Sequence, residues 1–391
     1  MHAIALLGRQ PELSIAELER VFKDVSWYSQ NSALINTDLE IDVQKLGGTQ
    51  KIGRVILESD QNSPSWRQIS EAIVRHYTNQ WSGHQGKITL GISAYGWDVS
   101  PREVQKVGLI LKAKLKKAGV SLRLIPNQDL ALSTATSHHN KLGLSANRIE
   151  LLVVRGQRGA IVAESLGSQN ITALANRDQG RPRRDAFVGM LPPKLALLMV
   201  NLAVGEKTNQ SLRVLDPFCG TGVLLQEATL LGHKVYGTDL SEKMIRYSAD
   251  NLKWLEKTHN LKVNMELQEG DAMDTVWNQP IDAVASETYL GQPFSAPPSP
   301  SKLTEVRGNC NRIIGTFLKN LSTQLAPGTS VVLAVPAWKD KSGSFTHLPL
   351  TSKLEDYGFS RIEFQNVDAK RLMYFRPDQI VARELLILKK A

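Results

Sequence analysis

A glycine turn between a strand and a helix constrains the fold of this chain more than any other feature. Residues 216–222 read Asp-Pro-Phe-Cys-Gly-Thr-Gly and follow the mostly apolar run 212–215. Gly220 and Gly222 lack side chains, so a ligand can approach the backbone N–H groups of the turn. Ligands bind at such turns, at the carboxyl edge of parallel α/β sheets. The sequence therefore predicts a parallel sheet with a nucleotide-type site at this turn.

A second acidic position follows at the expected distance. Residues 234–238 read as a strand that ends in Asp239, and a carboxylate there can accept both hydroxyls of a ribose. The Gly-x-Gly-x-x-Gly spacing of a NAD site is absent from the turn, which leaves NAD as the weaker alternative. Cys219 has no histidine in its loop to activate it, so we interpret it as a packing residue and not as a nucleophile.

Together, residues 216–222 and Asp239 resemble motif I and the next acidic position of S-adenosylmethionine-dependent methyltransferases. They are similar to the subset that methylates exocyclic amino groups of bases. The resemblance implies a Rossmann-like class I domain with a seven-stranded, mainly parallel sheet. It also implies that S-adenosylmethionine is the cofactor, and that Asp271, in the loop after a strand at 263–267, bonds its adenine. The cofactor-binding residues implied in this part of the chain are Asp216, Pro217, Phe218, Gly220, Gly222, Asp239 and Asp271.

The catalytic segment of such enzymes normally reads Asp-Pro-Pro-Tyr, and this chain departs from it. An exocyclic amine is a poor nucleophile, so a carboxylate accepts its N–H bonds while an aromatic ring stacks on the base. At 286–291 the chain reads Ser-Glu-Thr-Tyr-Leu-Gly. Glu287 can replace the aspartate, Tyr289 can stack, and Gly291 can allow close approach of the base. The alternative is an RNA-binding protein with a vestigial methyltransferase site.

The positive charge of the chain is concentrated before this domain. Of a net charge of +9, residues 101–185 contribute 15 Lys+Arg against 6 Asp+Glu. A basic surface of this kind binds phosphate backbones. Lys112 and Lys116 are therefore predicted to contact RNA, although a solvated helix face explains this helix equally well.

Nearly the whole chain is similar to THUMP-containing tRNA guanosine N2-methyltransferases of the archaeal and eukaryotic position-10 type. The similarity is carried by residues 6–14 and 46–52, by 177–184 (Arg-Asp-Gln-Gly-Arg-Pro-Arg-Arg) and by 189–196 (Gly-Met-Leu-Pro-Pro-Lys-Leu-Ala). It implies four parts: a ferredoxin-like α+β domain at 1–60, a THUMP-like RNA-binding domain at 61–172, a linker with the first catalytic helix at 173–205, and the methyltransferase domain at 206–391.

The same resemblance assigns roles around the linker. Leu191, Pro192 and Lys194 would border the methionine end of the cofactor, and Arg181 and Arg183 would contact RNA. The expected substrate is tRNA, methylated at N2 of a guanosine; a DNA amino-methyltransferase is the less favoured alternative. Whether a small activating protein is needed stays open.

Several classes are excluded by composition. The chain has two cysteines, too few for a disulfide framework, and no ligand set accompanies His138 and His139, so no metal is expected. The longest apolar stretch is too short to span a bilayer, and the first residues lack a basic leader. These features predict a cytoplasmic protein without membrane contact.

Three helices are predicted with defined ends. Ser14 and Glu17 form a capping-box pattern, which predicts a helix over 14–22. Pro193 suits a helix N-terminus, which predicts a helix over 193–204. A further helix is predicted over 350–357, and a strand over 330–336.

Overall fold

The computed structural model describes residues 1–59, 63–157, 159–185 and 191–391. Part of the block at 189–196, namely Gly189 and Met190, lies outside the described residues. The chain divides into two compact units. The first comprises residues 1–11, 24–45 and 49–173, and the second comprises 12–23, 46–48 and 174–391. None of the described helices is long and apolar enough to cross a membrane.

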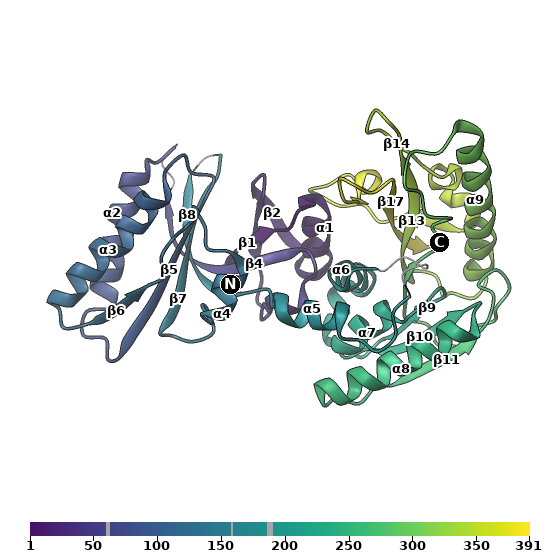
Figure 1. Ribbon diagram of the computed structural model, residues 1–391, viewed down its shortest axis with the longest axis horizontal. Coiled ribbons are helices and arrows are strands. Elements are labelled where there is room, and N and C mark those ends of the chain that lie inside the picture. The colour runs from purple at the N-terminus through teal and green to yellow at the C-terminus, as the bar shows by residue number, and fades with distance from the viewer. Residues whose placement is uncertain (60–62, 158, 186–190) are drawn as a thin grey trace. The chain divides into compact units, whose positions relative to one another are not determined.

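The first unit is built on one eight-stranded sheet, with strand order β2-β3-β1-β4-β8-β7-β5-β6. Helices α2 (Trp66–Gln80) and α3 (Pro101–Lys117) pack their apolar residues against it (Figure 1). A short helix, α4 (Thr134–His139), and the 3-10 turn η1 (Val43–Lys45) complete the unit. The strands are β1 (His2–Leu7), β2 (Asp24–Ser29), β3 (Ser32–Asn36), β4 (Thr49–Ser59), β5 (Lys87–Tyr95), β6 (Ser121–Leu124), β7 (Arg148–Arg155) and β8 (Ala160–Ser168).

This sheet runs without a break across the predicted boundary at residue 60. Strands β1 to β4 come from residues 1–60, strands β5 to β8 come from 61–172, and β4 pairs with β8 in antiparallel fashion. The division into two N-terminal domains remains a prediction; in the structure, the strands of both predicted domains belong to one sheet. Helix α5 (Ile171–Gln179) leads from this unit into the second.

The second unit contains the predicted mainly parallel sheet. Seven strands follow the order β11-β10-β9-β12-β13-β17-β15, and the short strands β14 and β16 pair at its edges. The neighbours from β11 to β13 are parallel, whereas β17 pairs with β13 and β15 in antiparallel fashion. The strands are β9 (Arg213–Asp216), β10 (Lys234–Asp239), β11 (Met265–Glu269), β12 (Ala283–Glu287), β13 (Ser330–Lys339), β14 (Phe345–Thr346), β15 (Phe359–Arg361), β16 (Met373–Tyr374) and β17 (Val381–Lys390).

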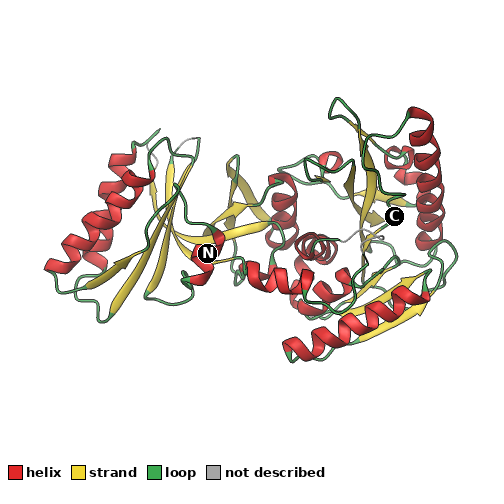
Figure 2. Cartoon of the chain, in the orientation of Figure 1, coloured by secondary structure: helices red, strands yellow, loops and turns green. Residues whose placement is uncertain are grey.

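Helices cover both faces of this sheet (Figure 2). One face packs against α6 (Pro193–Val204), α7 (Val223–Leu230) and α8 (Glu242–His259), and the other packs against α9 (Pro300–Ser322). Alternate residues of each strand point to opposite faces, which explains why the inner strands β13 and β17 are mostly apolar on both faces. The expected class I α/β fold is confirmed.

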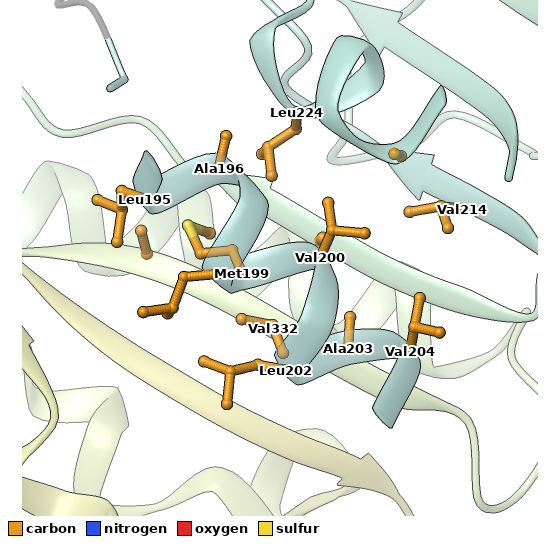
Figure 3. Close-up of a cluster of buried hydrophobic side chains, with 14 of the residues drawn as sticks. Leu195, Ala196, Met199, Val200, Leu202, Ala203, Val204, Val214, Leu224 and Val332 are labelled. Carbon is orange, nitrogen blue, oxygen red and sulfur yellow. The ribbon is translucent and has the colours of Figure 1, made fainter. Parts of the chain in front are cut away.

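Helix α6 forms the centre of one core. Every residue of α6 except Lys194 is buried, as expected for a helix that is apolar all round. Its side chains, with Met199 and Val200 in the middle, lie between the sheet at Val332 and helix α7 at Leu224 (Figure 3). The prediction of a helix over 193–204 is therefore confirmed.

The first helix differs from its prediction. Helix α1 (Pro11–Phe22) begins three residues before Ser14, so Ser14 is not its N-cap. The Ser14 hydroxyl instead donates to the carbonyl of Gly48 at 2.7 Å. Glu17 accepts hydrogen bonds from the backbone N–H groups of Gly47 and Gly48, both at 2.7 Å, and from the side-chain amide of Asn201 on α6. Ser14 and Glu17, which suggested a helix cap, therefore hydrogen-bond α1 to the glycine pair at 47–48.

The region over 350–357 also differs from the prediction. It forms two 3-10 segments, η3 (Pro349–Ser352) and η4 (Leu354–Tyr357), because the backbone of Lys353 is not helical between them. Further short turns are η2 (Gly205–Asn209) and η5 (Ala369–Arg371).

Candidate functional site

The site begins at the turn between β9 and α7. Gly220 and Gly222 both have positive φ, at 51° and 78°, and Gly222 is the N-cap of α7. A Cβ on Gly222 would lie 2.8 Å from Oγ of Ser248 on α8. The N–H of Cys219 donates to the carbonyl of Thr238 at 2.9 Å, which ties the turn to β10. The glycines are therefore required both by backbone conformation and by the close approach of α8.

Asp239 is held in place from two sides at the end of β10. Its Oδ2 accepts the N–H of Gly220 and its Oδ1 accepts the N–H of Ser241, both at 2.9 Å. Burial raises the pKa of Asp239, and these two backbone hydrogen bonds oppose the rise. Each carboxylate oxygen has a second lone pair, so Asp239 can still accept hydroxyl groups. The next residue, Leu240, exposes 70 % of its surface and presents an apolar side chain beside it.

Asp216 ends the central strand β9 and is buried. Its Oδ1 accepts the hydroxyl of Ser286 on β12 at 2.6 Å and the N–H of Phe218 at 3.2 Å. Burial raises the pKa of Asp216 to about 7, more than the hydrogen bonds from Ser286 and Phe218 lower it. The negative charges of Asp239 and Glu287 add to the rise. Three acidic ends of neighbouring strands thus influence one another electrostatically.

Asp271 follows β11 in a tight turn. Its Oδ1 accepts the N–H of Met273 at 2.9 Å, and its carbonyl accepts the N–H groups of Asp274 and Thr275. The turn fixes the direction of the carboxylate at the same edge of the sheet as Asp216 and Asp239. The three acidic residues expected at the cofactor site are therefore brought to neighbouring strand ends.

Cys219 lies inside the turn and not on its surface. It is buried, and the hydroxyl of Ser248 lies 3.7 Å from its Sγ. Burial raises the pKa of the thiol well above its usual range, with the charges of Asp216 and Asp239 adding to the effect. A thiol with a raised pKa is a poor nucleophile, which agrees with the packing role.

Glu287 ends β12 and makes an ion pair that no sequence pattern indicated. The Nε of Arg383, from β17, donates to Oε1 of Glu287. The side chains are 7 % exposed for Arg383 and 13 % for Glu287. Burial raises the pKa of Glu287, whereas the charge of Arg383 and its hydrogen bond act in the opposite direction. The carboxylate proposed for catalysis is thus anchored by a buried arginine.

The loop after Glu287 lacks the two prolines but is hydrogen-bonded to the neighbouring strand at its first residue. Both the N–H and the hydroxyl of Thr288 donate to the carbonyl of Ala334 on β13, at 3.0 and 3.1 Å. Tyr289 follows with 42 % of its surface exposed, as a ring that stacks on a base requires. The loop is therefore fixed to its neighbouring strand by Thr288, in place of the prolines.

Gly291 has a different role from the one predicted. It has a φ of 81°, and a Cβ there would lie 2.9 Å from Cγ1 of Val306 and 3.3 Å from Sγ of Cys310 on α9. The missing side chain faces α9, so Gly291 allows the loop to pack on that helix and does not open space for a base.

The other expected cofactor residues lie around this edge. Leu191 is buried in the core and Pro192 is the N-cap of α6, with Lys194 in its first turn. The carbonyl of Pro217 accepts the hydroxyl of Thr238 at 3.4 Å, and the ring of Phe218 packs edge-on against Phe317 at 5.0 Å. Pro217 and Phe218 therefore connect the turn to β10 and α9.

The four predicted RNA contacts divide into two kinds. Lys112 and Lys116 are exposed on α3, beside the stripe of its buried residues. Arg181 is only 3 % exposed, so its guanidinium is not presented to a surface phosphate and the expectation for it is corrected. Arg183 is exposed, but it pairs with Asp250 at 2.7 Å and lies over the ring of Tyr247.

Sequence reasoning missed Arg383, Thr288 and Leu240. One signal for Arg383 was available: residues 383 and 384 are charged and come directly before the apolar run 385–388. Thr288 carried no signal, because its importance comes from the carbonyl of Ala334, which lies 46 residues further on.

Comparison with known proteins agrees with this arrangement. Residues 208–342 match the family model described as a methyltransferase domain. A tRNA (guanine(10)-N2)-dimethyltransferase from Methanothermobacter thermautotrophicus is 32% identical over 165 residues, which cover 42% of this chain and 44% of that protein. The enzyme of the same name from Pyrococcus abyssi is 47% identical over 64 residues, 16% of this chain and 18% of that protein. The chain thus matches less than half the length of either relative.

The fold of the entire chain also has a counterpart. The crystal structure of TrmN from Thermus thermophilus superposes with a TM-score of 0.54 at 17% identity, and the match covers 100% of both chains. This likeness shows a shared fold. The methyltransferase domain that residues 216–222 and Asp239 predict is confirmed. The resemblance to the tRNA guanine-N2 enzymes, which rests on segments along nearly the whole chain, is confirmed as well.

Proposed function

We propose that this chain is an S-adenosylmethionine-dependent RNA methyltransferase that modifies the exocyclic N2 of a guanosine in tRNA. One observation carries the proposal: Asp216, Asp239 and Glu287 end three neighbouring parallel strands, and Asp271 follows the fourth strand, β11, by two residues, so that all four lie at one edge, beside the glycine turn. Ligands bind at this edge in open α/β sheets. The related enzymes named above act on guanine-10 of tRNA, which supports the choice of substrate.

The residues at this edge fit the proposed cofactor. Asp239 offers oxygen acceptors for the ribose hydroxyls, and Leu240 offers an apolar surface to the adenine ring. In Asp271, Oδ1 already accepts the N–H of Met273, so Oδ2 is available to the adenine amino group. When bound, S-adenosylmethionine supplies the methyl group. Leu191, Pro192 and Lys194 would border its methionine end.

Glu287 and Tyr289 would act on the base. The carboxylate of Glu287 accepts an N–H of the target amine and favours the developing positive nitrogen. The exposed ring of Tyr289 stacks on the base that is turned out of its strand. Thr288, which lies between them, fixes the positions of both residues through its hydrogen bond to β13. The carboxylate of Glu287, the exposed ring of Tyr289 and the hydrogen bonds of Thr288 to Ala334 support this assignment.

Single-turnover methylation of tRNA tests this function. We expect Glu287→Gln to slow methyl transfer by about a hundredfold, the usual effect of losing one transition-state contact, with nearly unchanged cofactor affinity. Tyr289→Ala should also reduce turnover, and the exposed-site control Glu363→Gln should not. The reaction is repeated with cell extract, which would supply a small activating protein if one is needed. Wild-type protein that stays inactive on every RNA would favour the vestigial-site alternative.

Binding of tRNA is assigned to the exposed lysines of α3. We expect the double variant Lys112→Glu, Lys116→Glu to weaken tRNA binding. The slope of log affinity against log salt concentration should become shallower by about one for each phosphate contact that is lost. Cofactor affinity should not change. Lys341→Glu, a single substitution of the same kind on an exposed loop of the second unit, is the control and is compared with each single lysine variant. Unchanged tRNA affinity in the double variant would mean that the lysine face is only solvated.

The cysteines and the proposed substrate bear on the cellular location of the protein. Both cysteines are free and buried, as is common in reducing compartments, and a tRNA substrate is consistent with the cytoplasm. We therefore propose a cytoplasmic site of action. Fractionation of cells, followed by detection of the protein, would test it.

A further inference from the structure

We propose that Arg383 is a positioning residue for methyl transfer: it holds Glu287 so that Oε2 of the carboxylate is presented to the target amine. The inference rests on the proposed function and extends it to a strand at the other end of the chain. No motif of the sequence includes Arg383. It follows from the strand order, the atoms paired and the faces of the sheet.

Strand order brings the two residues together. Glu287 on β12 is in register with Ala334 on β13, and Ala334 is in register with Leu385 on β17. Arg383 lies two residues before Leu385, opposite Pro336. Residues two apart in a strand share a face, so Arg383 and Glu287 lie on the same face with β13 between them. At Ala334 a small side chain leaves room for the arginine to cross.

Only one oxygen of the carboxylate is used by this pair. The Nε of Arg383 donates to Oε1 of Glu287. Within the described parts of the chain, no hydrogen bond reaches Oε2, and Oε2 is also absent from the side-chain atoms that are buried without a partner. Since the side chain keeps 13 % exposure, Oε2 is the oxygen that a substrate can reach. The arginine therefore fixes the rotamer without blocking the carboxylate.

The pair also controls the charge of Glu287. A carboxylate must be ionised to accept an N–H and later a proton. Burial at the end of β12 opposes ionisation and raises the pKa of Glu287, whereas the guanidinium of Arg383 favours the ionised form. Removal of Arg383 alone would leave a buried carboxylate without a counter-charge.

Few other charged groups act on Glu287. Asp216 ends β9 on the other side of β12, and the charge of Glu287 contributes to the raised pKa of Asp216. Helix α6 packs on β12 and β13 and has Lys194 as its only charged residue. On β13 the residue in register with Glu287 is Ala334, which is uncharged. Arg383 is thus the cation that faces Glu287 directly.

The neighbouring residue on β17 provides a matched control. Glu384 accepts from Nη2 of Arg361 at 3.2 Å and from Nδ1 of His347 at 2.7 Å. Leu385 and Ile387 belong to the core on the α6 side, whereas Leu386 and Leu388 belong to the core on the α9 side. Adjacent residues of a strand point to opposite faces, so Arg361 and Glu384 form a second buried Arg–Glu pair away from Glu287.

The test is single-turnover methylation of tRNA over a range of pH, with cofactor affinity measured in parallel. We expect Arg383→Met to slow the reaction by about a hundredfold at pH 7 and to leave cofactor affinity within about threefold. The acid limb of the pH–rate profile should move to higher pH, because Glu287 loses the charge that keeps it ionised. The loss should therefore shrink as the pH rises. Arg383→Lys keeps the charge and should restore part of the rate.

A double-mutant cycle separates positioning from a general structural effect. If Arg383 acts only through Glu287, the variant with both Arg383→Met and Glu287→Gln is no slower than Glu287→Gln alone. Arg361→Met, which removes the control pair, should lower stability without moving the acid limb. Additive losses in the cycle, or an unshifted limb in Arg383→Met, would overturn the assignment. An inactive wild type would instead overturn the proposed function, so the two failures are distinguishable.

Discussion

The raised pKa of Asp216 predicts that the catalytic unit loses stability between about pH 4 and pH 7. Below the ordinary pKa of 3.8 the carboxyl is protonated in both the folded and the unfolded chain. As the pH rises, the unfolded chain ionises first, whereas the folded chain keeps its proton until about pH 7. The unfolded state therefore gains free energy of ionisation that the folded state does not.

The size of the effect follows from the two pKa values. The folded value of about 7 exceeds 3.8 by about three units, and at about 1.4 kcal/mol per unit the folded state is disfavoured by about 4 kcal/mol above pH 7. Asp216→Asn removes the ionisation while its amide oxygen can still accept from Ser286 and Phe218. We expect the variant to be more stable than wild type by up to about 4 kcal/mol at pH 8 and about equally stable at pH 4.

Urea unfolding at pH 4, 6 and 8 measures this, with hydrogen exchange of β9 and β12 peptides reporting on the catalytic unit. Asp274→Asn, a change of the same kind on the exposed loop after β11, is the control and should show no pH-dependent gain. If wild type and Asp216→Asn lost stability in parallel from pH 4 to pH 8, Asp216 would not be the group responsible and the argument from burial would fail.

Three further predictions concern packing and the loop. Gly47→Ala should cost about 3 kcal/mol of unfolding free energy, since its Cβ would lie 2.2 Å from the carbonyl of Lys194, where neither backbone can move freely; urea unfolding checks this, and a loss below 1 kcal/mol would contradict it. Thr288→Val should keep the fold but lower methyl transfer about tenfold, because one of two hydrogen bonds to Ala334 is lost and the loop loosens; an unchanged single-turnover rate would show that the backbone bond suffices. Cys219→Ala should leave turnover within about threefold of wild type, whereas complete loss of activity in a folded, cofactor-binding variant would restore the nucleophile hypothesis.

The local part of the site could be predicted from the sequence. A strand, a glycine turn and a helix follow one another within residues 212–231, so their geometry depends mainly on the conformational freedom of Gly220 and Gly222. Asp239 was predicted in the same way, from its place at the end of a strand, whereas Asp271 was implied by the family resemblance. The structure brings both to the edge at which the parallel strands end.

The partners of these residues were decided by the tertiary structure. Glu287 is paired with a residue 96 positions away because β17 inserts beside β13 in antiparallel orientation, and no local pattern shows that pairing. Gly291 has an ordinary glycine conformation, but the helix it faces determines that it serves packing. Arg181 lies in the basic stretch of the sequence, yet the fold buries it. Sequence determines which groups are available and their local backbone, whereas burial and long-range pairing determine which of them are charged, exposed and free to act.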